Sequence, residues 1–180
     1  PAGRGVGGLG ALSSADLFHK DGLPYLVVPC LGGNHLFRDN GGGTFTVVTK
    51  AARFGGTGWS VGACFVDYDR DGHLDLIVSR YLDWDVDQNI YCGERRPGYR
   101  AYCHPDRFKP TTHLVYHNNG DGTFTDVSKA CGIGAVPSKG LGIAINDFDR
   151  DGWPDIGIAN DYLPQQPFRN NRHGTFTTAV

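Results

Sequence analysis

The chain has 180 residues, of which 27 are glycine, 10 are proline and none is methionine. Its formal net charge of −2 at pH 7 gives no electrostatic basis for binding nucleic acid or an anionic membrane. The apolar runs are only a few residues long, which excludes a membrane-spanning helix at the level of sequence. Frequent Thr, Val, Tyr and Phe among so many glycines predict short β-strands joined by tight turns.

Two sequence patterns recur along the chain. Residues 63–78 read ACFVDYDRDGHLDLIV, and residues 143–158 read IAINDFDRDGWPDIGI. A shorter pattern appears three times, as DNGGGTFTVV from residue 39, NNGDGTFTDV from residue 118 and NNRHGTFTTA from residue 170. These recurrences predict a unit of about fifty residues, with one long insertion over residues 83–112.

The first unit, residues 6–50, is the most degenerate of the three. Gly8–Leu12 resembles an opening strand and Leu26–Val28 a second strand. The loop between them is expected to have lost the acidic pattern of the later units, because His19 and Tyr25 stand where Asp69 and Asp75 would be. Thr44, Phe45 and Thr46 then alternate as expected for a strand with one buried face.

The later units, residues 57–130 and 138–180, each predict four strands in the same order. The opening strands are Trp59–Val66 and Gly140–Asn146, and the second strands are Leu76–Arg80 and Ile156–Asn160. The third strands end at Asn118 and Asn170, and a Gly turn leads into Thr-Phe-Thr. Four short strands per unit predict an all-β fold in which residues 1–180 form a partial β-propeller of about three blades.

Each later unit places a run of aspartates between its first two strands, in the pattern D-x-D-x-D-G-x-x-D. Calcium takes six to eight oxygen ligands, and carboxylates at alternate positions of a curled loop point inward. An EF-hand is excluded, because Val78 and Ile158 stand where that loop needs a glutamate. The predicted ligands of two structural Ca²⁺ sites are Asp67, Asp69, Asp71, the His73 carbonyl and Asp75, then Asp147, Asp149, Asp151, the Trp153 carbonyl and Asp155.

The alternative is a pair of acidic surface turns that bind nothing. Crowded carboxylates repel one another by roughly 1 kcal/mol per close pair even in a water-like dielectric. Only one arginine per loop, Arg70 or Arg150, offsets that repulsion locally. The recurrence of the same crowded pattern therefore favours a bound cation.

The five cysteines fall into two groups. Cys92 and Cys103 flank a short segment rich in Arg, Gly and Tyr, and a disulfide between them is the preferred interpretation over two unpaired thiols. Such a bond favours an extracellular or periplasmic location. Cys30, Cys64 and Cys131 lie in or beside apolar runs and are expected to be small buried residues.

The aspartate loops and the GDGTFTDV hairpin resemble FG-GAP or VCBS repeats, the blades of integrin-α-type propellers. The stretches YCGE from residue 91, PGYRAYCHPD from residue 97 and YHNNGDGTFTDV from residue 116 are similar to bacterial proteins related to cartilage acidic protein. The resemblance implies a seven-bladed or similar propeller, calcium in the blade loops, an extracellular role in adhesion or interaction, and no catalytic residues. The sequence departs from this family pattern, because it predicts about three blades and does not include the C-terminal domain of many relatives.

These observations favour a non-enzymatic, calcium-stabilised module for adhesion, protein interaction or assembly. A self-assembling subunit of an extracellular fibre and a domain of a larger secreted enzyme are the alternatives. The expected partners are further propeller blades or copies of the chain, and a protein or glycan ligand. The insertion at residues 83–112 is rich in Trp, Tyr and Arg, and it either binds a partner or covers a blade edge.

Overall fold

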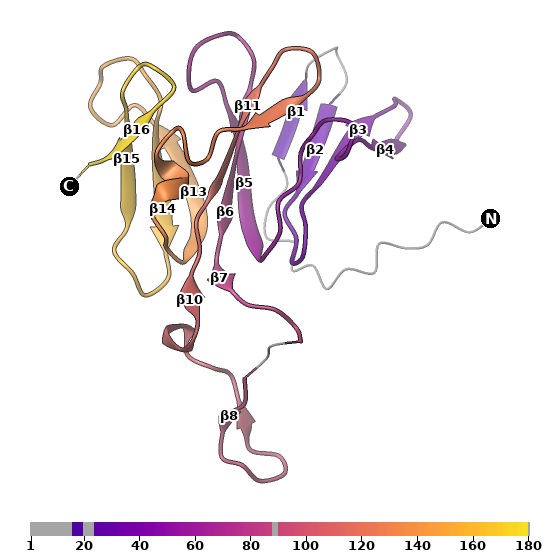
Figure 1. Ribbon diagram of the computed structural model, residues 1–180. Coiled ribbons are helices and arrows are strands. Elements are labelled where there is room, and N and C mark those ends of the chain that lie inside the picture. The colour runs from indigo at the N-terminus through magenta and orange to yellow at the C-terminus, as the bar shows by residue number, and fades with distance from the viewer. Residues whose placement is uncertain (1–15, 20–23, 88–89, 180) are drawn as a thin grey trace.

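The computed structural model describes residues 16–19, 24–87 and 90–179, and it contains three four-stranded antiparallel sheets side by side (Figure 1). The first sheet has the order β1 (Asp16–His19), β2 (Pro24–Val28), β3 (His35–Asp39) and β4 (Phe45–Val47). The second consists of β5 (Ser60–Val66), β6 (Asp75–Arg80), β11 (Leu114–Asn118) and β12 (Phe124–Asp126). The third consists of β13 (Gly140–Asn146), β14 (Asp155–Asn160), β15 (Gln166–Asn170) and β16 (Phe176–Thr178).

The insertion projects from the end of the second sheet (Figure 1). It leaves through β7 (Leu82–Asp83) and returns through β10 (Lys109–Pro110), which pair with each other. At its tip β8 (Cys92–Gly93) pairs with β9 (Arg100–Ala101), and the predicted Cys92–Cys103 disulfide is confirmed. Two short 3₁₀ helices, η1 (Pro105–Arg107) and η2 (Ile133–Ala135), complete the described elements, none of which is a helix suited to cross a bilayer.

The predicted strands of the second and third units are present, but the first unit needs a correction. The strand that pairs with β2 is Asp16–His19, whereas the predicted opening strand Gly8–Leu12 lies outside the described residues. Phe18 of β1 pairs with Tyr25 of β2, and Val66 of β5 pairs with Asp75 of β6 at the corresponding position of the second sheet. His19 therefore corresponds to Asp67 and not to Asp69, because residues 19–24 form a shorter connection than residues 67–74.

The second sheet lies between the other two and is buried on both faces. Leu76 and Val78 pack with Val27 and Leu36 of the first sheet. Between them in sequence, Ile77 points the other way and packs with Ile156 of the third sheet, among others. Successive residues of a strand face opposite sides, so burial on both faces explains why β6 is buried at successive positions and why its central residues Leu76–Val78 are all apolar and do not alternate with polar ones.

A buried histidine connects the second and third sheets at the end nearer the insertion. His113 is fully buried, and its Nδ1 accepts a hydrogen bond from the Arg80 N–H at 3.2 Å. Its Nε2 therefore carries the proton and lies 2.6 Å from Ser138 Oγ and 3.2 Å from Gln166 Oε1. Gly140 is required beside the ring, because a Cβ there would lie 2.4 Å from His113 Cε1. Burial, together with the nearby charge of Arg80, lowers the pKa of His113 to about 4, against the opposing effect of the hydrogen bond to Gln166.

This histidine predicts a loss of stability in mild acid. An unfolded histidine titrates near pH 6.5, so between about pH 6.5 and 4 the unfolded chain binds a proton that the folded chain excludes. The contribution of His113 to the free energy of unfolding should fall by about 3 kcal/mol across this window and remain constant above it. His113→Asn keeps an acceptor for Arg80 without titrating, so the difference in unfolding free energy between the two proteins, measured by urea unfolding at a series of pH values, isolates this contribution. A difference that does not change with pH would contradict the assignment.

Candidate metal centre

The two aspartate loops lie at the end of the sheets away from the insertion, because each connects the first two strands of its sheet (Figure 1). Their backbones follow the same path. Arg70 and Arg150 have φ angles of 62° and 61°, and Gly72 and Gly152 have φ angles of 88° and 87°. The positive φ at the glycine allows the sharp turn that brings the later residues of each loop back towards its first aspartate.

Three aspartates of each loop converge. In the first loop, oxygens of Asp67, Asp69 and Asp75 all lie within 4.8 Å of one another. In the second loop, the same holds for the corresponding residues Asp147, Asp149 and Asp155. Asp71 belongs to a neighbouring group with Asp69 and His117, whereas Asp151 is in neither kind of group. The first, third and ninth positions of the pattern are therefore brought together, and the fifth is not equivalent in the two loops.

The ninth aspartate of each loop also holds strands together. The Asp75 carboxylate is completely buried and accepts hydrogen bonds from the N–H groups of Tyr68, at 3.3 Å, and Asn118, at 2.8 Å. In the second loop, Asp155 accepts from Phe148 N–H at 2.9 Å and Asn170 N–H at 2.8 Å. Burial, together with the charge of Asp69, raises the pKa of Asp75 to about 7 against the opposing effect of these hydrogen bonds.

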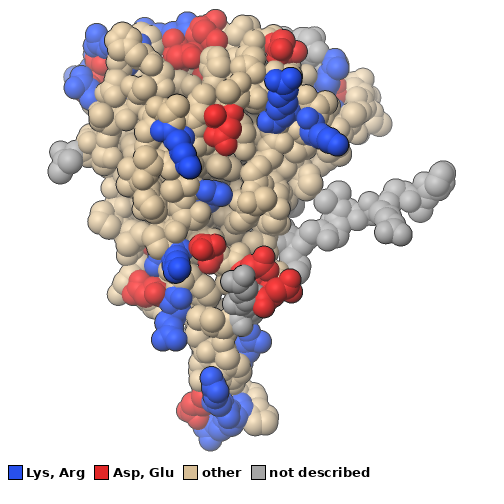
Figure 2. Space-filling view, in the orientation of Figure 1, with Lys and Arg blue, Asp and Glu red and all other residues tan. Residues whose placement is uncertain are grey.

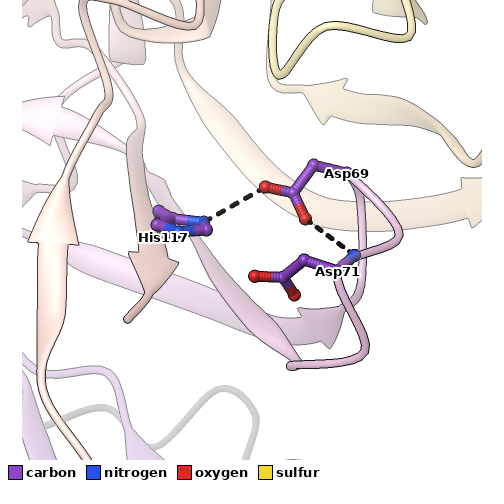
Figure 3. A group of neighbouring side chains, drawn as sticks. All are labelled: Asp69, Asp71 and His117. Atoms are coloured by element: carbon purple, nitrogen blue, oxygen red, sulfur yellow. Dashed lines mark hydrogen bonds and ion pairs between the residues drawn. The ribbon is translucent and has the colours of Figure 1, made fainter. Parts of the chain in front are cut away.

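In the first loop, the carboxylate oxygen atoms are not all paired with a hydrogen-bond donor. Asp67 Oδ2 accepts from Gly72 N–H at 3.1 Å, but the buried Oδ1 has no hydrogen-bond donor among the described residues. His117, from β11, points its ring at the cluster (Figure 3), with Nδ1 3.2 Å from both Asp69 Oδ2 and Asp75 Oδ1. This nitrogen is close to both oxygens, but it makes no hydrogen bond to any of the described residues. The cluster therefore contains carboxylate oxygens that a cation could neutralise.

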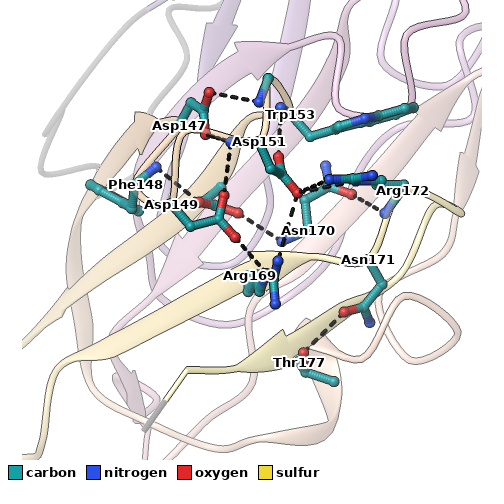
Figure 4. A network of polar contacts seen from close by, with 12 residues as sticks. Asp147, Phe148, Asp149, Asp151, Trp153, Arg169, Asn170, Asn171, Arg172 and Thr177 are labelled. Atoms are coloured by element: carbon teal, nitrogen blue, oxygen red, sulfur yellow. Dashed lines mark hydrogen bonds and ion pairs between the residues drawn. The ribbon is translucent and has the colours of Figure 1, made fainter.

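The second loop is surrounded by arginines (Figure 4). Arg169, which takes the place of His117, lies 2.6 Å from Asp149 Oδ2. Arg172 donates two hydrogen bonds to Asp151 Oδ2, at 2.9 and 3.1 Å. The Trp153 N–H, with Arg172, lowers the pKa of Asp151 below its usual value. Both oxygens of Asp147 accept backbone hydrogen bonds, so the negative charge here is better compensated than in the first loop.

A glycine explains why the first loop lacks the second arginine. Gly120 occupies the position of Arg172, and a Cβ there would lie 2.8 Å from His73 Nε2. The His73 ring thus takes the space that a side chain at position 120 would need. The two loops also contact each other, since the Arg70 guanidinium lies over the Trp153 ring at 4.7 Å.

The sequence identified the converging aspartates but missed the residues that distinguish the loops. The N–H groups of His73 and Trp153 donate to Asp71 and Asp151, and the proposed role of their carbonyl oxygens stays a prediction. The contributions of His117, Asn118, Arg169, Asn170 and Arg172 were not predicted. The recurring Asn-Asn pair before each Gly turn was the available signal, because it ends the strand that lies beside the loop.

These observations define an all-β repeat protein with an acidic loop in two of its repeats. The chain belongs to the FG-GAP-like repeat family, whose model matches residues 18–78 and 110–158. The resemblance noted in the sequence is thereby confirmed at the level of the family. The gap between the two matched segments, residues 79–109, covers most of the insertion.

Short stretches of the chain are also similar to cartilage acidic protein 1. The identity is 39% over 56 residues for the Xenopus tropicalis protein, which is 31% of this chain and 9% of that protein. It is 42% over 48 residues for the Homo sapiens protein and 40% over 48 residues for the Mus musculus protein, in each case 27% of this chain and 7% of the relative. The match thus spans less than a tenth of these relatives.

The two roles of aspartate predict different costs for two substitutions made in the presence of EDTA. Asp75→Ala leaves the buried N–H groups of Tyr68 and Asn118 without an acceptor, which should cost roughly 2–4 kcal/mol of unfolding free energy. Asp71→Ala removes an exposed carboxylate and should change stability by no more than about 0.5 kcal/mol. Urea unfolding of both variants checks this, and equal losses would argue against a cation-independent role for Asp75.

Proposed function

We propose that the chain is a calcium-stabilised interaction module and that its three sheets are blades of a β-propeller. Three four-stranded sheets of the same order pack face to face, and two apolar cores separate them. The outer face of the first sheet exposes Phe45 and Val47, at 46% and 57%, so further blades or a second copy would cover it. The disulfide and the family favour an extracellular or periplasmic location. No catalytic role is assigned.

The observation that carries the calcium proposal is the buried Asp67 Oδ1. It has no donor among the described residues, although two further carboxylates lie within 4.8 Å. A buried acceptor without a partner costs free energy, and crowded negative charge adds to that cost. A hard divalent cation relieves both terms, and Asp67, Asp69 and Asp75 would hold it through oxygen atoms. The charge of the ion would neutralise the loop and fix the ends of β5 and β6 to β11.

Calcium is therefore expected to raise thermal stability. At about 100 times the dissociation constant, one site contributes about 2.7 kcal/mol, or roughly 5–10 °C in Tm for a domain of this size. Scanning calorimetry of the chain in EDTA, in Ca²⁺ and in Mg²⁺ measures the effect. Magnesium should stabilise less, because it demands stricter geometry. An identical Tm in EDTA and in excess Ca²⁺ would refute the proposal.

The two loops should bind with unequal affinity. Arg169 and Arg172 already neutralise carboxylates of the second loop, whereas the first loop has His117 and Gly120 at these positions. The tighter site should thus be the first. Isothermal titration should show that Asp67→Asn removes the tighter event and that the matched Asp147→Asn removes the weaker one. Arg169→Ala should tighten the second site about tenfold by removing a competing charge, and unchanged affinity would show that the arginine does not compete.

A further inference from the structure

A cleft of about 680 Å³ lies between the body of the protein and the disulfide-bonded hairpin. One wall is aromatic: the Trp59 ring lies 5.2 Å from that of Tyr81 and 5.3 Å from that of Trp84. Tyr81 donates a hydrogen bond to Asp161, the residue that follows β14 of the third sheet, and this contact fixes the wall. The opposite wall includes Arg100, Tyr102 and Cys103 of the hairpin.

The hairpin wall depends on the disulfide. The Cys92–Cys103 bond joins its two sides covalently, beside the residue pairs of β8 and β9 and the Arg100 guanidinium, which lies 5.8 Å from the Tyr91 ring. Gly93 is needed for this close approach, since a Cβ there would lie 2.3 Å from the Tyr99 carbonyl oxygen. Tyr102 stands fully exposed at the cleft, at 105%, although it carries a large apolar ring. An exposed aromatic residue on a constrained hairpin is typical of a contact surface.

The chemistry of the lining favours an apolar side chain over a sugar. Most of the lining residues are aromatic or aliphatic, and Arg100 is the one charged residue among those identified in the described part of the chain. The Tyr81 hydroxyl is already engaged by Asp161. A sugar would bring many hydroxyl groups into a site with few partners, and each unpaired polar group costs binding free energy. A peptide side chain such as Trp or Phe would pack against the aromatic wall of the cleft without that cost.

The charge around the cleft indicates which residues should flank the aromatic side chain of the partner. Figure 2 shows positive charge gathered at the lower tip of the molecule, where the hairpin lies. Arg95, Arg96 and Arg100 line a second hollow there, next to the cleft that shares Arg100. Glu94 pairs with Arg96 at 2.7 Å, but the arginines outnumber it. Asp83 and Asp85 alternate in sequence with the lining residues Leu82 and Trp84 and do not line the cleft.

We propose that this cleft binds an acidic peptide segment of a partner protein, with an aromatic side chain of the peptide inserted between Trp84 and Tyr102 and carboxylates on Arg95 and Arg100. The proposal rests on the proposed function as an interaction module and names its partner by chemistry. Arginine binds carboxylates in a planar, two-pronged geometry, and Trp, Tyr and Arg are the residues that most often dominate interfaces.

The probe is a fluorescein-labelled peptide with one tryptophan between two runs of three glutamates, measured by fluorescence anisotropy against the full chain in Ca²⁺. Replacing its tryptophan by alanine, or its glutamates by lysine, should weaken binding at least about tenfold. Tyr102→Ala and Arg100→Glu should each weaken binding by a similar factor. The matched controls Leu141→Ala and Lys129→Glu alter exposed residues outside the insertion and should leave binding unchanged.

Reduction of the disulfide gives an independent readout. Treatment with a reductant, or the double change Cys92→Ser and Cys103→Ser, should abolish peptide binding while the calorimetric Tm in Ca²⁺ changes little. Binding that survives reduction, equal binding of the lysine peptide, or binding of a sulfated oligosaccharide in place of the acidic peptide would overturn the inference. If calcium raises the Tm but the peptide does not bind, the peptide-binding inference is overturned and the proposed function remains intact.

Discussion

The buried carboxylates of Asp75 and Asp155 are the constraint on which the arrangement of the second and third sheets depends. Each accepts one N–H from its own loop and one from the Asn that ends the third strand. The Asn side chains return the contact: Asn118 Nδ2 donates to the Leu74 carbonyl, and Asn170 Nδ2 donates to those of Tyr68 and Pro154. Because Tyr68 belongs to the loop of the second sheet, Asn170 also ties neighbouring sheets together. The acidic loops are thus part of the hydrogen-bonded frame.

This hydrogen-bonded frame explains how the same aspartate pattern can have different charged neighbours in the second and third sheets. The ninth aspartate accepts hydrogen bonds from backbone donors in both loops, so the difference in positive charge comes from residues of the third strand and the following turn. His117 and Gly120 leave the first cluster short of positive charge, whereas Arg169 and Arg172 supply it to the second. The two loops thus share a backbone path and differ in the positive charge that surrounds their carboxylates.

The fold also separates two kinds of chemistry by topology. In a four-stranded antiparallel sheet, the connection after the first strand and the connection after the second emerge at opposite ends. The acidic loop follows β5, and the aromatic and basic insertion follows β6, so they lie at opposite ends of the second sheet (Figure 1). A cation held by the acidic loop, as proposed, would therefore lie away from the cleft, and His113 stabilises the end of the sheets from which the insertion departs.

The sequence by itself determined the all-β class, most strand positions, the family and the converging aspartates, because these follow from local patterns that recur along the chain. It also determined the Cys92–Cys103 pair, because few residues separate them. Tertiary structure decided the rest. The shorter first connection moved His19 out of the predicted register, since pairing and not residue count sets equivalence. Only packing placed His117 and Arg169 at their loops and Trp59 beside Trp84, because those contacts join residues that are far apart in sequence, which a local pattern does not relate.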